Sequence, residues 1–177
     1  MSRLHVETAT PADLPTLATV AAATFPLACP PSATPENVAA FIADNLSEQR
    51  FAEYLADPER IVLVARETTR MIGYAMLIHG VPDDDDVQRA VPARPALELS
   101  KIYLLPDQHG AGGAPALLTE TLQRAAECEV ACVWLGVNQE NRRAQRFYTK
   151  QGFVINGTKT FRLGSGVEND YVMVREV

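Results

Sequence analysis

The sequence predicts one α/β domain, residues 1–177, with a mixed central sheet of about seven strands flanked by helices. Three observations favour this class. Segments with apolar residues at helical spacing alternate with short apolar runs that are typical of strands. The chain has 177 residues, 47% of them hydrophobic, which is enough for a sizeable single core. A glycine-rich turn connects one predicted strand to the helix that follows it.

The first part of the chain predicts a strand followed by helices. Residues 3–9 alternate weakly between apolar and polar side chains, as a strand does. Two helices each start with a Thr-Pro pair, in which threonine is the N-cap and proline takes the first helical position. The predicted segments are a helix from Thr10 to about Phe25, a loop over 26–33, a helix from Thr34 to about Leu46 and a short helix after Ser47.

The middle of the chain predicts a hairpin and an acidic loop. Residues 61–78 hold two apolar runs around a polar turn, which indicates a β-hairpin. In the loop after it, Asp83 to Asp86 place four carboxylates in a row, and such a run cannot pack inside the protein. The loop is therefore either a solvated connection or an electrostatic attraction for a cationic substrate, and both interpretations stay open.

The second half of the chain is organised around the glycine-rich turn at 106–118. The strand predicted over 97–105 leads into it, and a helix runs from it to about Cys128. Glycines adopt backbone angles closed to other residues, and the free N–H groups of a helix start attract a phosphate. The turn is thus either a phosphate seat or a plain connection without a ligand. Simple alternation along the strand gives one face to Glu98, Ser100, Ile102 and Leu104.

The remaining predicted elements close the sheet. They are a strand over 130–137, a helix from about Asn141 to Gln151 that Gly152 ends, and two strands at 153–155 and 171–174.

Composition excludes several classes of protein. The net charge of −6 argues against a general nucleic-acid-binding surface. No apolar run approaches the ~20 residues that span a bilayer, and the N-terminus lacks a signal-peptide pattern, so we expect a cytoplasmic protein without membrane contact. The three cysteines are expected to be reduced and mostly buried, and the three histidines lack metal-ligand spacing, so no metal site is expected.

One stretch near the C-terminus carries a motif. Residues 134–153 contain Val-Asn-x-x-Asn-x-x-Ala-x-x-Phe-Tyr-x-x-x-Gly-Phe, which resembles the pattern of the GNAT superfamily of N-acyltransferases. The glycine-rich turn resembles the same family's acyl-coenzyme A pyrophosphate loop, Gln/Arg-x-x-Gly-x-Gly/Ala, and the two motifs keep the family's order and separation. The resemblance covers residues 60–177 firmly and implies the GNAT fold with acetyl-coenzyme A as co-substrate. Features near the N-terminus look most similar to the PaiA-type polyamine N-acetyltransferase branch.

The resemblance implies a role for individual residues. Tyr148 matches the family's general acid, and Asn141, which is also a helix N-cap candidate, matches a contact to coenzyme A. Ile102 and Leu104 match strand positions whose backbone groups hold the pantetheine arm. The full expected set for acetyl-coenzyme A is Ile102, Tyr103, Leu104, His109, Gly110, Ala111, Gly112, Gly113, Ala114, Asn141 and Ala144.

Two positions in the turn depart from the family pattern. His109 stands where the family has glutamine or arginine, which removes the expected side chain but keeps the backbone seat. Gly113 stands where a bulky aliphatic residue is usual, which predicts a slightly looser loop.

The expected chemistry is direct attack of an amine on a thioester. A phenol has a pKa of ~10 against ~8.5 for a thiol, so Tyr148 stays protonated at neutral pH and is placed to give a proton to the departing sulfur. Glu98 is the best candidate for the base that takes a proton from the amine, through a water. The alternatives are a core aromatic for Tyr148 and a structural carboxylate for Glu98.

The sequence therefore predicts an acetyl-coenzyme A-dependent N-acetyltransferase that acts on a small, cationic, polyamine-like primary amine. The alternatives are a protein or peptide N-acetyltransferase and a non-catalytic acyl-coenzyme A sensor. The expected partners are the small amine and a second copy of the chain, since dimers are frequent among enzymes of this kind. The sequence does not identify the acceptor.

Overall fold

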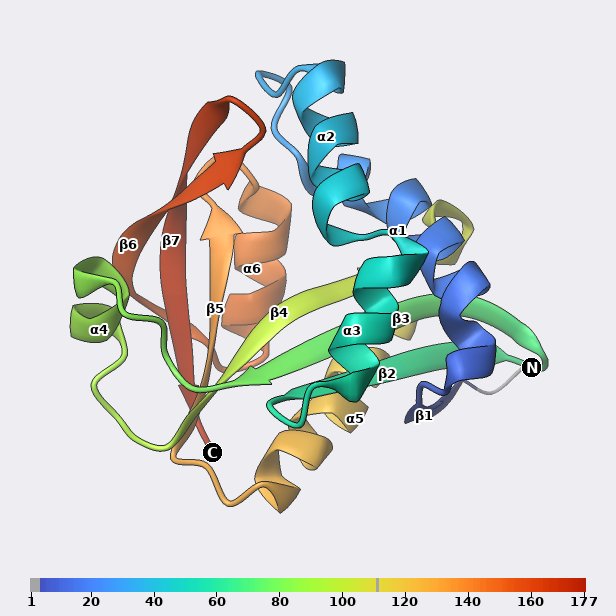
Figure 1. Cartoon of the computed structure of the whole chain (residues 1–177). Coiled ribbons are helices and arrows are strands. Elements are labelled where there is room, and N and C mark those ends of the chain that lie inside the picture. The colour runs from blue at the N-terminus through green and yellow to red at the C-terminus, as the bar shows by residue number, and fades with distance from the viewer. Residues whose placement is uncertain (1–3, 111) are drawn as a thin grey trace.

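A computed structural model describes residues 4–110 and 112–177 of the chain. Figure 1 shows one twisted sheet with helices on both of its faces. The helices are α1 (Leu14–Ala28), α2 (Pro35–Asn45), α3 (Glu48–Ala56), α4 (Asp85–Ala90), α5 (Gly113–Glu127) and α6 (Arg142–Lys150). The strands are β1 (Leu4–Thr8), β2 (Arg60–Glu67), β3 (Arg70–His79), β4 (Ala96–Leu104), β5 (Cys132–Asn138), β6 (Val154–Leu163) and β7 (Gly166–Glu176).

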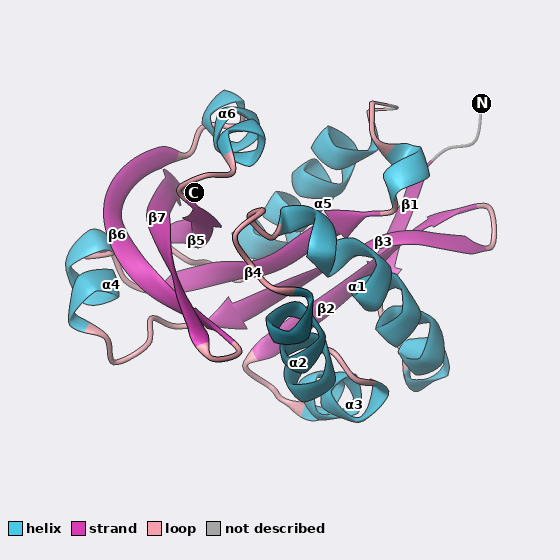
Figure 2. Cartoon of the chain, turned by 90° about the horizontal axis from the view of Figure 1, so that it is seen from above, coloured by secondary structure: helices cyan, strands magenta, loops and turns pink. Residues whose placement is uncertain are grey.

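The sheet has seven strands in the order β1-β2-β3-β4-β5-β7-β6, which confirms the predicted mixed sheet. Neighbouring strands are antiparallel except β4 and β5, which are parallel because the chain crosses over through α5 between them. Figure 2 shows α1, α2 and α3 on one face of the β1–β4 part and α5 on the other. No helix within the described ranges is long and apolar enough to cross a membrane.

The predicted helix starts at Thr34 and Ser47 are confirmed by their caps, whereas Thr10 is followed by a 3-10 turn (Pro11–Asp13) and α1 begins only at Leu14. The Thr34 hydroxyl accepts a hydrogen bond from the N–H of Asn37 (3.1 Å), and the Ser47 hydroxyl accepts one from the N–H of Arg50 (3.1 Å). Each cap satisfies a backbone donor that the first helical turn leaves without a partner. Gly152 ends α6 with a φ of +94°, the left-handed conformation expected after a helix.

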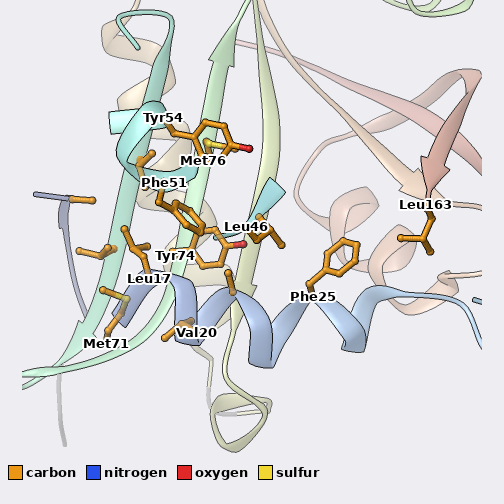
Figure 3. Close-up of a cluster of buried hydrophobic side chains, with 14 residues drawn as sticks. Leu17, Val20, Phe25, Leu46, Phe51, Tyr54, Met71, Tyr74, Met76 and Leu163 are labelled. Carbon is orange, nitrogen blue, oxygen red and sulfur yellow. The ribbon is translucent and has the colours of Figure 1, made fainter. Parts of the chain in front are cut away.

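The largest core cluster lies between the sheet and the N-terminal helices. Figure 3 shows Leu17, Val20 and Phe25 of α1 facing side chains from β3 and α3, with Leu163 of β6 at the far end. The other face of the sheet packs against α5 and α6. Burying these apolar faces holds the helices to the sheet, and with them the loops at one end of it.

Three segments differ from the sequence prediction. Helix α1 continues to Ala28 and contains Pro26 in its last turn, although proline there removes one backbone donor. The acidic loop is partly helical, since α4 begins at Asp85. Strands β6 and β7 extend over 154–163 and 166–176, well beyond the predicted short strands, because β6 is a polar edge strand without an apolar signal.

A β-bulge in β4 overturns the simple alternation. Met76 of β3 pairs with Lys101, whereas the next residue, Leu77, pairs with Leu99, so Ser100 is an extra residue. The bulge reverses the faces after it. The face under α1 to α3 carries Glu98, Lys101 and Tyr103, and the face under α5 carries Leu97, Leu99, Ile102 and Leu104.

Candidate active site

The site begins where β4 and β5 separate. The two strands pair only at Ala96–Cys132, Leu97–Val133 and Glu98–Trp134, although both continue for several residues. Beyond Glu98 they diverge (Figure 1). A cavity of about 540 Å³ opens at this split and reaches both faces of the sheet. The diverging part of β4 therefore presents backbone groups that β5 does not use.

The glycine-rich turn forms one end of the cavity. Gly110 and Gly112 have φ values of +82° and +79°, and no atom lies within 4 Å of where a Cβ would stand at either residue. The turn thus offers open space beside its backbone, directly before the N-terminus of α5. Such a turn fits the phosphates of coenzyme A, because the local N–H groups and the helix dipole both attract anions. Ala111 lies outside the described residues.

Gly113 and His109 have structural roles that the motif did not specify. A Cβ at Gly113 would stand 3.0 Å from Cδ1 of Leu104, so glycine lets the start of α5 lie against β4 rather than loosening the loop. The His109 ring donates from Nε2 to the carbonyl oxygen of Leu104 (3.2 Å). His109 therefore braces the turn against the end of β4.

The predicted positions on β4 and α6 meet at the same cavity. Its lining includes Ile102, Tyr103, Leu104, Ala114, Asn141 and Ala144. The Asn141 side-chain oxygen accepts a hydrogen bond from the N–H of Ala144 (3.1 Å), which makes Asn141 the N-cap of α6. The N-cap interpretation of Asn141 is thus confirmed, and its contact to coenzyme A stays a prediction for a side chain that also lies at the cavity wall.

Tyr148 reaches the split from α6. Its ring packs against Phe147 and Phe153, with ring centroids 5.4 and 5.7 Å away. The side chain lies deep in the protein but keeps accessible surface because it lines the cavity. Burial raises the pKa of Tyr148 above its ordinary value, so the phenol stays protonated at neutral pH.

Glu98 lies on the opposite face of the split, beside the cavity. Burial raises the pKa of its carboxyl group, and the nearby Lys101, Lys159 and Arg60 oppose the rise. A carboxylate with a raised pKa accepts a proton more readily than an exposed glutamate does. Glu98 and Tyr148 thus line one cavity, from strand β4 and helix α6.

The part of the cavity around Glu98, called the acceptor side below, holds charged residues that the sequence did not single out. Lys101 of β4 lies on the same face as Glu98, and Lys159 of β6 pairs with Asp170 of β7 at 3.5 Å. Glycine at position 136 makes room for this pair, since a Cβ there would collide with Cε of Lys159. These residues are remote in sequence and share no motif, so no sequence signal identified them.

The acidic loop is not part of the cavity lining. Asp84 caps α4, with its side-chain oxygen accepting from the N–H of Val87 (3.1 Å), and Asp86 pairs with Arg89 at 2.7 Å. Two of the four carboxylates therefore have local structural partners. This arrangement favours the solvated connection over the substrate attraction.

Comparison with known sequences identifies relatives along nearly the whole chain. A model of the acetyltransferase (GNAT) family matches residues 27–153. An uncharacterized N-acetyltransferase of Mycobacterium tuberculosis is 59% identical over 165 residues, which cover 93% of this chain and 98% of that protein. An uncharacterized N-acetyltransferase of Lactobacillus delbrueckii subsp. lactis is 25% identical over 161 residues, 91% of this chain and 90% of that protein.

Solved structures share the fold at low sequence identity. The PaiA N-acetyltransferase of Thermoplasma acidophilum in complex with coenzyme A has a TM-score of 0.77 at 18% identity, over 99% of both chains. The ribosomal-protein-S18-alanine N-acetyltransferase of Escherichia coli has a TM-score of 0.69 at 20% identity, over 99% of this chain and 94% of that one. The PaiA enzyme is thus one of several structural neighbours, and the PaiA branch stays a prediction.

Proposed function

The chain belongs to the GNAT family of acetyltransferases, and from this premise we propose that it transfers the acetyl group of acetyl-coenzyme A to the primary amine of a small acceptor. The observation that carries the proposal is the meeting of Tyr148 and Glu98 at one cavity, across the split between β4 and β5. A protein that only senses acyl-coenzyme A has no need of an acid and a base at the same cavity.

Some residues at the split bind acetyl-coenzyme A, and others transfer protons. The turn at Gly110 and Gly112 binds the phosphates, and the free backbone of β4 around Ile102 holds and polarises the thioester arm. Acetyl-coenzyme A itself supplies the activated acyl group. Glu98 takes the proton that the attacking amine must lose, and Tyr148 gives one to the departing sulfur. Positioning two substrates in one cavity supplies much of the rate.

The acceptor side supports an amine with positive charge. Glu98, Glu168 and Asp170 place three carboxyl groups around this part of the cavity, beside two lysines, Lys101 and Lys159, of which Lys159 pairs with Asp170. Attraction between carboxylates and ammonium groups favours a cationic, polyamine-like acceptor. The acidic loop at Asp83 adds nothing to this argument, because it does not line the cavity. A homodimer and a cytoplasmic location remain predictions.

The test measures release of free thiol from acetyl-coenzyme A against a panel of amines. The panel contains spermidine, putrescine, an aminoglycoside, free amino acids and short peptides. Turnover with small amines supports the proposal, whereas turnover with peptides alone moves the assignment to a protein N-acetyltransferase. A protein that binds coenzyme A tightly but turns over none of these amines would favour the sensor.

A further inference from the structure

We infer that the acceptor carries an anionic group, a carboxylate or a phosphate, in addition to its amine, and that Lys101 binds this group. The inference rests on the proposed function, since it names the class of acceptor for the same cavity. Lys101 would thus recognise an anionic group in a site whose carboxylates otherwise favour a cationic acceptor. A diamino acid, which is cationic overall and also bears a carboxylate, meets both requirements.

Lys101 is a cation without a carboxylate partner. It lines the cavity on the face of Glu98, and its Nζ donates to the carbonyl oxygen and the hydroxyl of Ser100, at 3.2 and 3.4 Å. Across residues 4–110 and 112–177, no carboxylate oxygen lies within 4.0 Å of Lys101 Nζ. Burial lowers the pKa of Lys101, with Glu98 opposing the change. The charge of this residue is thus costly in the free protein and would be relieved by an anion.

Most of the other partly buried cations have a carboxylate partner, while Arg124 donates to the Thr8 hydroxyl and Arg175 to the carbonyl oxygen of Gln151, each at 2.9 Å. Lys159 pairs with Asp170 at 3.5 Å, and Arg66 pairs with Glu7 at 2.7 Å and with Asp13. Lys101 and Lys159 both line the cavity, and of these two only Lys159 has a carboxylate within 4.0 Å, which leaves Lys101 open as a cationic binding point. That difference points to a group supplied from outside the chain.

Aromatic rings surround Lys101, and the face of the nearest one stabilises its positive charge. The ring of Phe41 lies 5.8 Å from Lys101 Nζ, stacks on Phe25 at 4.5 Å and meets Phe161 at 5.2 Å. Phe25 of α1 and Phe161 of β6 line the cavity and form an apolar wall there, and Phe41 of α2 packs against both rings. Apolar walls displace water and lower the local dielectric, so an ion pair formed there is stronger than one at the surface.

Glu98 and Lys101 together define the chemistry of the acceptor. They share one face of β4 because the bulge at Ser100 turns Lys101 to the side of Glu98. A molecule with an amine at Glu98 and an acid beside Lys101 matches both charges. A plain diamine that brings a second ammonium group beside Lys101 meets repulsion instead.

The test compares amines that differ by one anionic group. The pairs are ornithine with putrescine, lysine with cadaverine, and phosphoethanolamine with ethanolamine, each assayed for thiol release by the wild type and by Lys101→Met. In the wild type we expect kcat/KM for the acid-bearing member of at least one pair to exceed that of its partner about tenfold or more, the effect of one charge-assisted contact. In Lys101→Met that ratio should fall at least about tenfold. The carboxylate and phosphate pairs distinguish the two sources of the anion.

Two further measurements keep a structural role apart from a binding role. Lys101→Arg retains the charge and should recover part of the preference, and coenzyme A affinity should be equal in all three proteins. A preference for the plain amines, or a ratio unchanged in Lys101→Met, overturns the inference.

The proposed function can fail separately. If the wild type releases no thiol with any of the six amines, the acetyl transfer proposed for these acceptors is wrong. Calorimetric binding of the same pairs to the coenzyme A-loaded protein then decides the role of Lys101, since tighter binding of an acid-bearing member that Lys101→Met removes supports it. Equal binding within every pair overturns it.

Discussion

The two sides of the cavity are assembled in different ways. The coenzyme A side takes its groups from two continuous stretches, 102–114 and 141–148, and relies on backbone and glycine. The acceptor side gathers side chains from several strands and from α1, among them Glu98, Lys101 and Phe25. A constant co-substrate is thus met by local backbone geometry, whereas the variable acceptor is met by side chains that can change without altering the fold.

The largest expected effect is on the catalytic rate and concerns Tyr148. Tyr148→Phe should lower kcat by about 10²–10⁴-fold, the usual contribution of one acid–base group. Acetyl-coenzyme A affinity should survive, since the ring packing of Tyr148 against Phe147 and Phe153 is kept. Steady-state kinetics and calorimetric binding measure the two quantities. An unchanged kcat would remove Tyr148 from the chemistry.

A somewhat smaller effect is expected at the acceptor side. Glu98→Gln should lower kcat/KM by about 10²-fold, the lower end for a base that acts through water. Because burial raises the pKa of Glu98, the wild-type rate should fall with decreasing pH at a higher pH than an ordinary glutamate would give. The profile of kcat/KM against pH should lose this acidic limb in the variant, while persistence of the limb would assign it to another group.

The turn provides a test confined to the coenzyme A side. Gly112→Ala places a side chain at a φ of +79°, and an alanine in the left-handed region costs ~1–2 kcal/mol. In an exposed turn the free protein can relax, and binding must then restore the strained form. We expect KM for acetyl-coenzyme A to rise about 5- to 30-fold with little change in kcat.

Gly80→Ala is the matched control for the turn. Gly80 has a φ of +100° with open space around it, and it does not line the cavity. The variant should carry similar strain without a change in KM. Equal KM values for both glycine variants and the wild type would separate the turn from coenzyme A binding.

The smallest expected effects are changes in the free energy of unfolding. They compare Asp13, which has a charged partner, with Lys101, which has no carboxylate partner. Burial alone would raise the pKa of Asp13, but the Thr10 N–H and Arg66 hold it below the ordinary value. Asp13→Asn should therefore destabilise the protein by about 1–3 kcal/mol at neutral pH. This contribution is present above the unfolded-state pKa of ~3.9 and is lost as the pH falls through the lower folded-state pKa. The difference in Tm from the wild type should accordingly shrink in acid.

Lys101→Met should act in the opposite direction. Removing a buried charge without a carboxylate partner should stabilise the free protein by about 0.5–2 kcal/mol, the scale of a stabilising change at a functional site. Thermal unfolding at neutral pH measures it. A lower Tm for this variant would mean that Lys101 serves the fold.

The sequence predicted the local parts of the molecule better than the assembled ones. The caps at Thr34 and Ser47, the glycine-rich turn and the capped start of α6 at Asn141 depend on neighbours a few residues away, and they were foreseen. The bulge at Ser100 was not, because it depends on the register between β3 and β4. It moved Glu98 to the face opposite Ile102, which strict alternation had placed beside it.

The charged acceptor side could not be predicted for a related reason. Lys159 and Asp170 are polar residues in an edge hairpin, where such residues normally face solvent, and only the sheet order brings them near Lys101. The family resemblance supplied the roles of the coenzyme A side, which remain predictions for individual residues. For the acceptor it supplied only the likeness to the PaiA branch, which stays a prediction, because the family motifs lie in the shared half of the site.

The short seam between β4 and β5 has a consequence for how the protein folds. The pairs β2–β3 and β6–β7 are hairpins between neighbouring segments, whereas the three-pair seam forms only after the chain has passed through α5. Contacts distant in sequence form slowly because the loop must close first. The catalytic split should thus be completed late in folding and should open early in local unfolding. Acetyl-coenzyme A that binds only the paired form of β4 and β5 should stabilise this form. Its binding should therefore slow amide exchange at the junction of the two half-sheets.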